Sequence, residues 1–173
     1  MISDEEQQEL AAVESPETKD VQEIPPLSIP DYVHELVTRA RQAAGRLATL
    51  STVVKNNALI AMADALDEKQ VLLIEANEKD VEAFGTEPDK AAMADRLRLT
   101  EQRIADMSAG IREVAKLPDP LGDMPKMWTR PNGMQVGRVR VPIGVIGIIY
   151  ESRPNVTADS AALCLKSGNA CVL

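Results

Sequence analysis

The stretch IGVIGIIYESRPNVTADSAALCLKSGNACVL, residues 143–173, decides the fold of the chain. It opens with an almost wholly apolar, β-branched run over residues 143–150, which predicts a strand buried on both faces of a parallel sheet. A polar turn over residues 151–155 then precedes a predicted helix, residues 158–167, and a second apolar strand that starts at Ala170. This strand–helix–strand order is the building unit of doubly wound α/β folds.

The segment before this unit predicts a β-hairpin. Two segments of alternating polarity, residues 127–130 and 134–141, flank the tripeptide Pro131-Asn132-Gly133. Asn-Gly between alternating segments is a strong hairpin signal, and Pro142 ends the second segment.

Residues 28–125 are expected to form a layer of helices. Ser28 and Asp31 have the spacing of a capping box at the start of the first helix, and a second helix begins near Ser51 or Thr52. The apolar face expected for this second helix comprises Val54, Ala58, Ala61, Met62 and Ala65.

Three further helices are expected in this layer. One extends from about Lys69 to Phe84 and stops at Gly85, a residue that tolerates left-handed backbone. Two shorter signals follow, because Thr86 and Asp89 can cap a helix that ends at Met93 and Thr100 can cap another that ends before Pro118.

Charge is distributed unevenly along the chain. Residues 1–30 carry a net charge of −7 and residues 31–125 carry −5, whereas residues 126–173 carry +4, with six bases and two acids. The acidic residues 1–27 contain few large apolar side chains and are therefore expected to be a disordered tail. The basic region indicates either a small anionic ligand or a solvated hairpin flanked by arginines, and both interpretations stay open.

Composition excludes several functional classes. Aromatic residues make up only 2% of the chain, which disfavours binding of single-stranded nucleic acid. The N-terminus lacks a secretory signal, no apolar run is long enough to span a bilayer, and no metal-ligand spacing occurs. Both cysteines, Cys164 and Cys171, are expected to be buried and inert. Together these features indicate a cytoplasmic protein with no membrane or nucleic-acid partner.

Three polar residues stand in the turn where α/β proteins bind ligands, at the carboxyl end of the first parallel strand. Arg153 could pair with a carboxylate or phosphate, and Ser152 or Asn155 could donate a hydrogen bond to an oxyanion. The alternative is that all three only form the turn and cap the following helix. Gly144 and Gly147 lie inside the strand and therefore do not form a dinucleotide fingerprint.

The last apolar run has no polar stop before Leu173. Two parallel strands cannot form a stable sheet on their own, so we expect the sequence to be a fragment of a longer protein.

Several of these stretches together resemble one enzyme family. The sequence is similar to gamma-glutamyl phosphate reductases over residues 130–133, 137–157 and 161–170. Shorter matches lie among the helices, at residues 40–44, 77–80 and 117–120. These enzymes, also called glutamate-5-semialdehyde dehydrogenases, belong to the aldehyde dehydrogenase superfamily. The resemblance covers about residues 30–173 and leaves the acidic tail outside.

The resemblance implies an organisation of the chain. Residues 28–125 would be the helical part of a cofactor domain, and residues 126–141 a β-hairpin flap used for oligomerisation. Residues 142–173 would be the first strand–helix–strand of a Rossmann-like parallel sheet, which is incomplete here. The expected fold class is thus α/β, with an N-terminal helical layer, a hairpin flap and the start of a parallel sheet.

The resemblance also implies an activity. The family reduces L-glutamate 5-phosphate to L-glutamate 5-semialdehyde and phosphate with NADPH, in proline biosynthesis. The family's nucleophilic cysteine lies downstream of Leu173, and neither Cys164 nor Cys171 matches it, so this chain alone is expected to be inactive. Glutamate 5-kinase is a further implied partner, and the hairpin is expected to join copies of the chain.

Site residues follow from the same resemblance. Ser152 and Asn155 are both candidates for the oxyanion, since the ungapped alignment favours one and the residue type favours the other. Arg153 is expected to bind the substrate, and the residues expected to bind NADPH or NADP are Ile149, Tyr150, Glu151 and Lys166. Two other hypotheses stay open: a non-catalytic, truncated paralogue that acts as a dimerisation module, and a different acyl-reducing enzyme of the superfamily.

Overall fold

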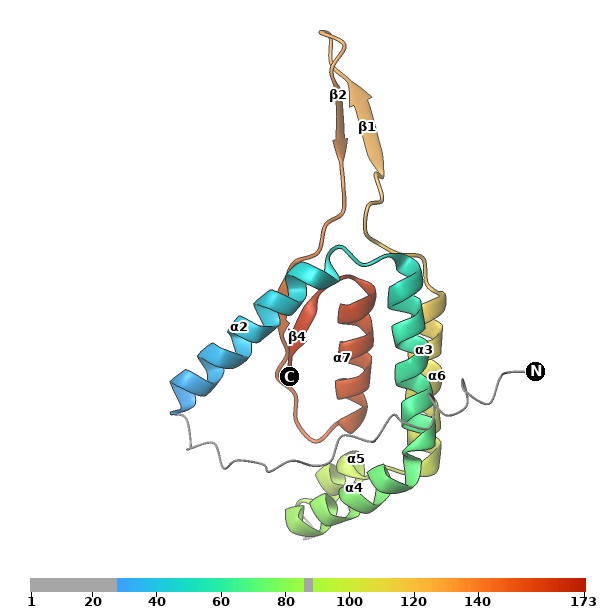
Figure 1. Cartoon of the computed structure of the whole chain (residues 1–173). Coiled ribbons are helices and arrows are strands. Elements are labelled where there is room, and N and C mark those ends of the chain that lie inside the picture. The colour runs from blue at the N-terminus through green and yellow to red at the C-terminus, as the bar shows by residue number, and fades with distance from the viewer. Residues whose placement is uncertain (1–27, 86–88) are drawn as a thin grey trace, which may run out of the picture. The chain divides into compact units, whose positions relative to one another are not determined.

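The computed structural model describes residues 28–85 and 89–173 (Figure 1). The expected acidic tail over residues 1–27, and Thr86 as a cap, lie outside the described residues. Residues 33–173 form one compact unit, which includes everything after the first turn of α2.

The described elements are helices followed by a hairpin and a parallel strand pair. The helices before the hairpin are α2 (Ile29–Leu47), α3 (Thr52–Glu68), α4 (Gln70–Phe84), α5 (Ala91–Leu97) and α6 (Glu101–Lys116). They are followed by β1 (Lys126–Thr129), β2 (Gln135–Arg138), β3 (Val145–Gly147), α7 (Pro154–Lys166) and β4 (Ala170–Val172). This arrangement confirms the expected α/β class with helices first, then a hairpin, then a short parallel sheet.

Helix starts follow the predicted caps in three places. The Asp31 amide donates to Ser28 Oγ at 3.4 Å, and the amide of Val54 donates to Ser51 Oγ at 3.4 Å. Thr100 caps α6 in the same way, with the amide of Arg103 as donor at 3.2 Å. Each contact satisfies an amide that has no partner inside the helix.

The expected short helix is the exception among the helix starts. Helix α5 begins at Ala91 with Lys90 as its N-cap residue, and it continues to Leu97 instead of ending at Met93. The prediction that Asp89 caps this helix is therefore wrong. Asn77 of α4 stabilises the end of α5, because its side chain donates to the Leu97 carbonyl at 2.9 Å and accepts from the Leu99 amide at 2.6 Å.

The core lies where α3, α6 and α7 pack against one another. Its buried residues are small or unbranched for the most part: Leu59, Ala63, Met107, Ile111, Ala115, Ala158 and Ala162. The buried face of α3 carries Lys55, Leu59 and Ala63. This face is shifted to one side of the apolar face that was expected from the sequence. Arg112 of α6 adds an ion pair to each of Asp64 and Asp67 on α3, at 2.7 Å each.

The hairpin forms as predicted, with shorter strands. Strands β1 and β2 are antiparallel, with Trp128 opposite Val136, and Figure 1 shows the two strands extending away from the helices. In the connection, the Gly133 amide donates to the Arg130 carbonyl at 2.9 Å, and Gly133 has a φ of 83°. The turn is therefore of type I and is followed by a glycine with positive φ, because Asn132 lacks the positive φ that a two-residue Asn-Gly turn would need and Pro131 favours the second position of a type I turn.

The strand expected over residues 143–150 is shorter in the structure. Only Val145–Gly147 pairs with β4 in parallel, because β4 itself has three residues and Gly144 bends the backbone with a φ of 119°. The buried amide Oδ1 of Asn169 accepts from the Gly144 amide at 2.8 Å and ties this bend to the start of β4.

Helix α7 begins four residues earlier than the sequence predicted. Pro154 occupies the first helical turn, where a missing amide hydrogen costs nothing, so Asn155 belongs to the helix and not to the turn before it. The helix ends as expected at Gly168, whose φ is +71°. None of the described helices is long and apolar enough to cross a membrane.

Candidate functional site

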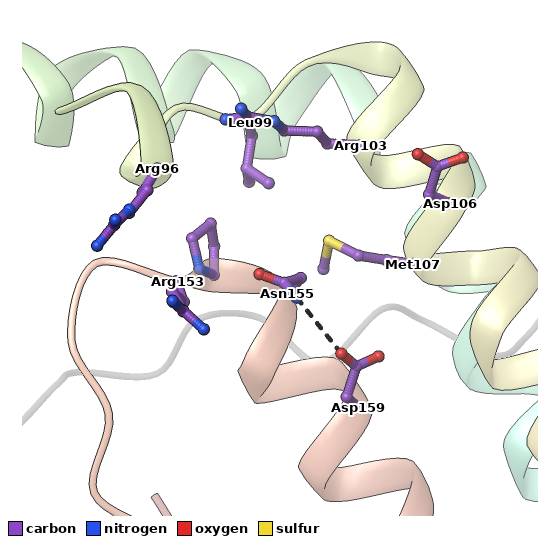
Figure 2. Close-up of a pocket in the computed structure, with 9 residues that line it drawn as sticks. Arg96, Leu99, Arg103, Asp106, Met107, Arg153, Asn155 and Asp159 are labelled. Carbon is purple, nitrogen blue, oxygen red and sulfur yellow. Dashed lines mark hydrogen bonds between the residues drawn. The ribbon is translucent and has the colours of Figure 1, made fainter. Parts of the chain in front are cut away.

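A cavity of about 500 Å³ lies between α6, the α5–α6 connection and the start of α7. Figure 2 shows its lining, which comprises Arg96, Leu99, Arg103, Asp106, Met107, Arg153, Pro154, Asn155 and Asp159. The size is within the range of small-molecule sites in proteins. Three guanidinium groups and two carboxylates make this cavity highly charged, and its floor is apolar where Leu99, Met107 and Pro154 contribute.

The turn after β3 presents its residues in two directions. Arg153 and Asn155 line the cavity, whereas Ser152 does not, although it is adjacent to Arg153 in sequence. Ser152 has a φ of 50°, which is unusual for a residue with a side chain. This left-handed residue turns the chain sharply between β3 and α7.

The side chain of Asn155 is oriented by its own helix. Its Nδ2 donates to Asp159 Oδ2, one turn further along α7, at 3.4 Å. A second N–H of the same amide is left available, because an asparagine amide has two. The arrangement can therefore present one hydrogen-bond donor to a ligand in the cavity.

The arginines of the cavity differ in how they are held. Arg103 is fixed by the end of α5: its guanidinium donates to the carbonyls of Asp95 and Arg98 and pairs with the Asp95 carboxylate at 3.3 Å. Within residues 28–85 and 89–173, the side chains of Arg96 and Arg153 make no hydrogen bond or ion pair. As far as the described part of the chain shows, two of the three cations can therefore pair with an anionic ligand.

The residues expected to bind the cofactor fall into two groups. Ile149 is fully exposed, Glu151 is exposed and Tyr150 is half-buried, with its hydroxyl 2.5 Å from Thr157 Oγ1. Lys166 lies elsewhere, in the core at the end of α7, and is 4% exposed. Its ammonium donates to Asn56 Oδ1 at 2.6 Å and to the Ala115 carbonyl at 2.9 Å.

Lys166 belongs to a buried polar network with a second lysine. Lys55 of α3 pairs with Asp119 at 2.5 Å and donates to the Lys166 carbonyl at 3.2 Å. Burial would raise the pKa of Asp119, but hydrogen bonds from Lys55, the Leu121 amide and Thr52 outweigh burial and hold it below its usual value. Burial lowers the pKa of Lys166. The charge of the Asp119 carboxylate raises it and that of the Lys55 ammonium lowers it, so the net shift is downward.

Neither cysteine lies at the cavity. Cys164 is buried in α7, and burial raises the pKa of its thiol, which disfavours the reactive thiolate. Cys171 is half-buried in β4, so it is more accessible than the sequence suggested. Among the described residues, no cluster of three or more His, Cys, Asp or Glu side chains could hold a metal ion.

Comparison with known proteins gives one consistent family. The sequence is 60% identical over 135 residues to the gamma-glutamyl phosphate reductase of Moorella thermoacetica and 53% identical over 147 residues to that of Clostridium novyi. The chain is homologous to the gamma-glutamyl phosphate reductases. These matches cover 78% and 85% of this chain but only 32% and 35% of the two relatives, so the chain spans about a third of the length of the enzymes it matches. It matches no protein-family model.

Solved structures of gamma-glutamyl phosphate reductases have the same fold over this part. The crystal structure from Thermotoga maritima superposes with a TM-score of 0.78 at 42% identity and covers 82% of this chain and 34% of that one. The one from Saccharomyces cerevisiae gives a TM-score of 0.74 at 31% identity, over 84% of this chain and 36% of that one. The resemblance inferred from the sequence is therefore confirmed.

Sequence reasoning found two of the cavity residues, Arg153 and Asn155, and missed the others that carry charge. Arg96, Arg103, Asp106 and Asp159 were missed because no local pattern distinguishes them from surface charges on helices. The feature that joins them is tertiary, since the first three are about fifty residues away from α7 in the sequence.

Proposed function

We propose that the protein to which this chain contributes reduces L-glutamate 5-phosphate to L-glutamate 5-semialdehyde and phosphate with NADPH, in the cytoplasm. The observation that carries the proposal is the placement of Arg153 and Asn155 in one charged cavity, within a sequence 60% identical to a gamma-glutamyl phosphate reductase. The nucleophile is a cysteine other than Cys164 and Cys171, so the 173-residue chain alone has no reductase activity.

Arg153 binds an anionic group of the substrate in this proposal. Its guanidinium lines the cavity and has no partner among the residues that the structure describes. A planar guanidinium can make two parallel hydrogen bonds to a carboxylate or phosphate, which fixes the orientation of the ligand as well as its position.

Asn155 is the better candidate for stabilising the oxyanion. Its amide lines the cavity and is held by Asp159, whereas Ser152 does not line the cavity. A donor that is oriented before the reaction stabilises the negative charge that develops on the acyl oxygen without a further cost of reorganisation.

NADPH would be held at the carboxyl end of β3, the edge at which α/β sheets bind nucleotides. The fully exposed Ile149 offers an apolar surface for a ring, and Tyr150 and Glu151 lie beside it in the chain. When bound, NADPH supplies the hydride. Lys166 does not fit this role in the described arrangement, because its ammonium is buried and donates to Asn56 and Ala115.

The hairpin is proposed to join copies of the protein. It carries exposed apolar side chains, including Met127 and Met134, which are 53% and 55% exposed, and Lys126 lies over the Trp128 ring at 6.0 Å. Exposed apolar residues at the end of an extended element are typical of an interface. A transient partnership with glutamate 5-kinase, which would deliver the unstable acyl phosphate directly, is a further part of the proposal.

A growth experiment tests the proposed reaction. The segment of this chain that matches the Moorella thermoacetica reductase replaces its counterpart in that enzyme, and the hybrid is expressed in a bacterium that lacks its own reductase. Growth without proline is expected for the hybrid and for the surface control Glu113→Gln, and slower growth or none for Arg153→Gln. A folded hybrid that does not support growth would contradict the proposal and favour a non-catalytic dimerisation module.

A further inference from the structure

The charges of the cavity are separated by sign. In Figure 2, the side chains of Arg96 and Arg153 lie toward one end of the labelled residues, and those of Asp106 and Asp159 lie toward the other. Asn155 lies between the two ends. A ligand that carries only negative groups would use the first end and be repelled by the second.

At the acidic end, the carboxylate of Asp159 can accept further hydrogen bonds. Asp159 accepts a single long hydrogen bond from Asn155 and forms no ion pair with a described lysine or arginine. Asp106, by contrast, already accepts from Gln102 Nε2 at 2.8 Å. Gly110 of α6 faces Asp159, and even a Cβ at that position would lie 3.9 Å from Asp159 Oδ1, so the carboxylate is not crowded.

The cationic end has two guanidinium groups without a hydrogen-bond or ion-pair partner among the described residues. Arg96 projects from the last turn of α5 and Arg153 from the N-cap of α7, so two elements that are distant in sequence converge on the same ligand group. Arg103 is excluded from this set because the end of α5 already uses its guanidinium.

We propose that this cavity recognises the ammonium group of an α-amino acid, with Asp159 binding the α-ammonium group and Arg96, together with Arg153, binding the anionic group at the far end of the side chain. The proposal rests on the reductase function and assigns Asp159 and Arg96 as specificity-determining residues for its amino-acid substrate. A glutaryl compound without the amino group would lose the contact to Asp159 and keep the contacts to the two arginines.

Binding of two small probes to the full 173-residue chain tests the assignment. L-glutamate and glutarate differ by the ammonium group, and ligand-observed NMR titrations give their dissociation constants at low protein concentration. L-glutamate is expected to bind about fivefold more tightly than glutarate, because a partly exposed ion pair contributes up to about 1 kcal/mol. Asp159→Asn should remove this preference, because it weakens L-glutamate binding and relieves the repulsion of glutarate. Glu113→Gln, which removes an equal charge outside the cavity, should retain the preference.

Each contrary outcome is decisive. Equal binding of the two probes, absence of L-glutamate binding, or a preference that persists in a folded Asp159→Asn variant would overturn the role of Asp159. Arg96→Gln should weaken both probes by a similar factor, and unchanged binding of both would overturn the role of Arg96. These measurements require no turnover, so a failed growth test with intact probe binding would refute the reductase proposal and leave the amino-acid site standing.

Discussion

Replacing Asp119 by asparagine is expected to destabilise the protein strongly. Lys55 is 1% exposed, and its ammonium lies 2.5 Å from the Asp119 carboxylate, which is the only acidic side chain that the structure describes in this network. Lys166, 4% exposed, is a second cation in the same region. The variant Asp119→Asn would therefore leave two buried ammonium groups without an opposing charge.

The magnitude follows from this geometry. Removing one partner of a buried ion pair costs about 3–5 kcal/mol, a large part of the roughly 5–15 kcal/mol that stabilises an ordinary domain. The hydrogen bonds that Thr52 and the Leu121 amide donate to Asp119, at 2.7 and 3.0 Å, would be weakened as well. The variant Lys55→Met removes one cation and keeps an apolar chain of similar length, so in combination it should offset part of the loss.

Urea denaturation of the wild type, both single variants and the double variant measures these effects. Asp119→Asn should lower the midpoint by about 2 M, given a typical dependence of roughly 1–3 kcal/mol per molar urea. The double variant should be more stable than the sum of the single losses predicts, by at least about 1 kcal/mol. A loss below about 1 kcal/mol for Asp119→Asn, or additive single losses, would refute this account of the network.

Two further predictions concern Gly168 and Lys166. Gly168→Ala should cost about 2 kcal/mol. Its φ is +71°, and the new Cβ would lie 2.6 Å from Leu121 Cδ1, at the end of a flexible side chain, and 3.2 Å from Cγ of the stiffer Pro142 ring. Gly122→Ala, with a φ of +76° and no atom within 4 Å, is the matched control and should cost about 1 kcal/mol from strain alone. Equal shifts in the thermal midpoint of the two variants would show that the contacts with Leu121 and Pro142 add no cost. Burial lowers the pKa of Lys166 in the folded state. Above that lowered pKa, the unfolded chain therefore holds more protons than the folded chain. The contribution of Lys166 to the free energy of unfolding should then rise with pH toward roughly 10.4. Lys166→Met should remove this rise, which urea denaturation at alkaline pH below roughly 10.4 would measure. An unchanged pH profile would contradict the assignment.

Local chemistry explains which parts of the fold the sequence could predict. The caps at Ser51 and Thr100, the hairpin at Gly133 and the helix end at Gly168 each depend on neighbouring residues only, and each was predicted correctly. The aliphatic run of β3 and β4 likewise indicated a parallel strand pair. Such features are encoded within a few residues and need no knowledge of distant contacts.

Tertiary contacts explain what was missed. The buried face of α3 includes Lys55, which no hydropathy pattern would place in a core, and it is there because Asp119 and the Lys166 carbonyl receive its ammonium. The early start of α7 at Pro154 moved Asn155 from the predicted turn into the helix. The cavity itself depends on α6 and α7 packing together, so its other charged residues could not be recognised from the sequence.

The most direct test of the central claim is the NADPH oxidation rate of the purified hybrid enzyme, in which this chain's matching segment replaces its counterpart in the Moorella thermoacetica reductase. L-glutamate 5-phosphate is supplied continuously by glutamate 5-kinase and ATP, and phosphate release is followed in parallel. The account predicts oxidation that depends on the acyl phosphate, with a much lower kcat/KM for Arg153→Gln and an unchanged value for Glu113→Gln. A folded hybrid that oxidises no NADPH, or one in which Arg153→Gln has no effect, would contradict it.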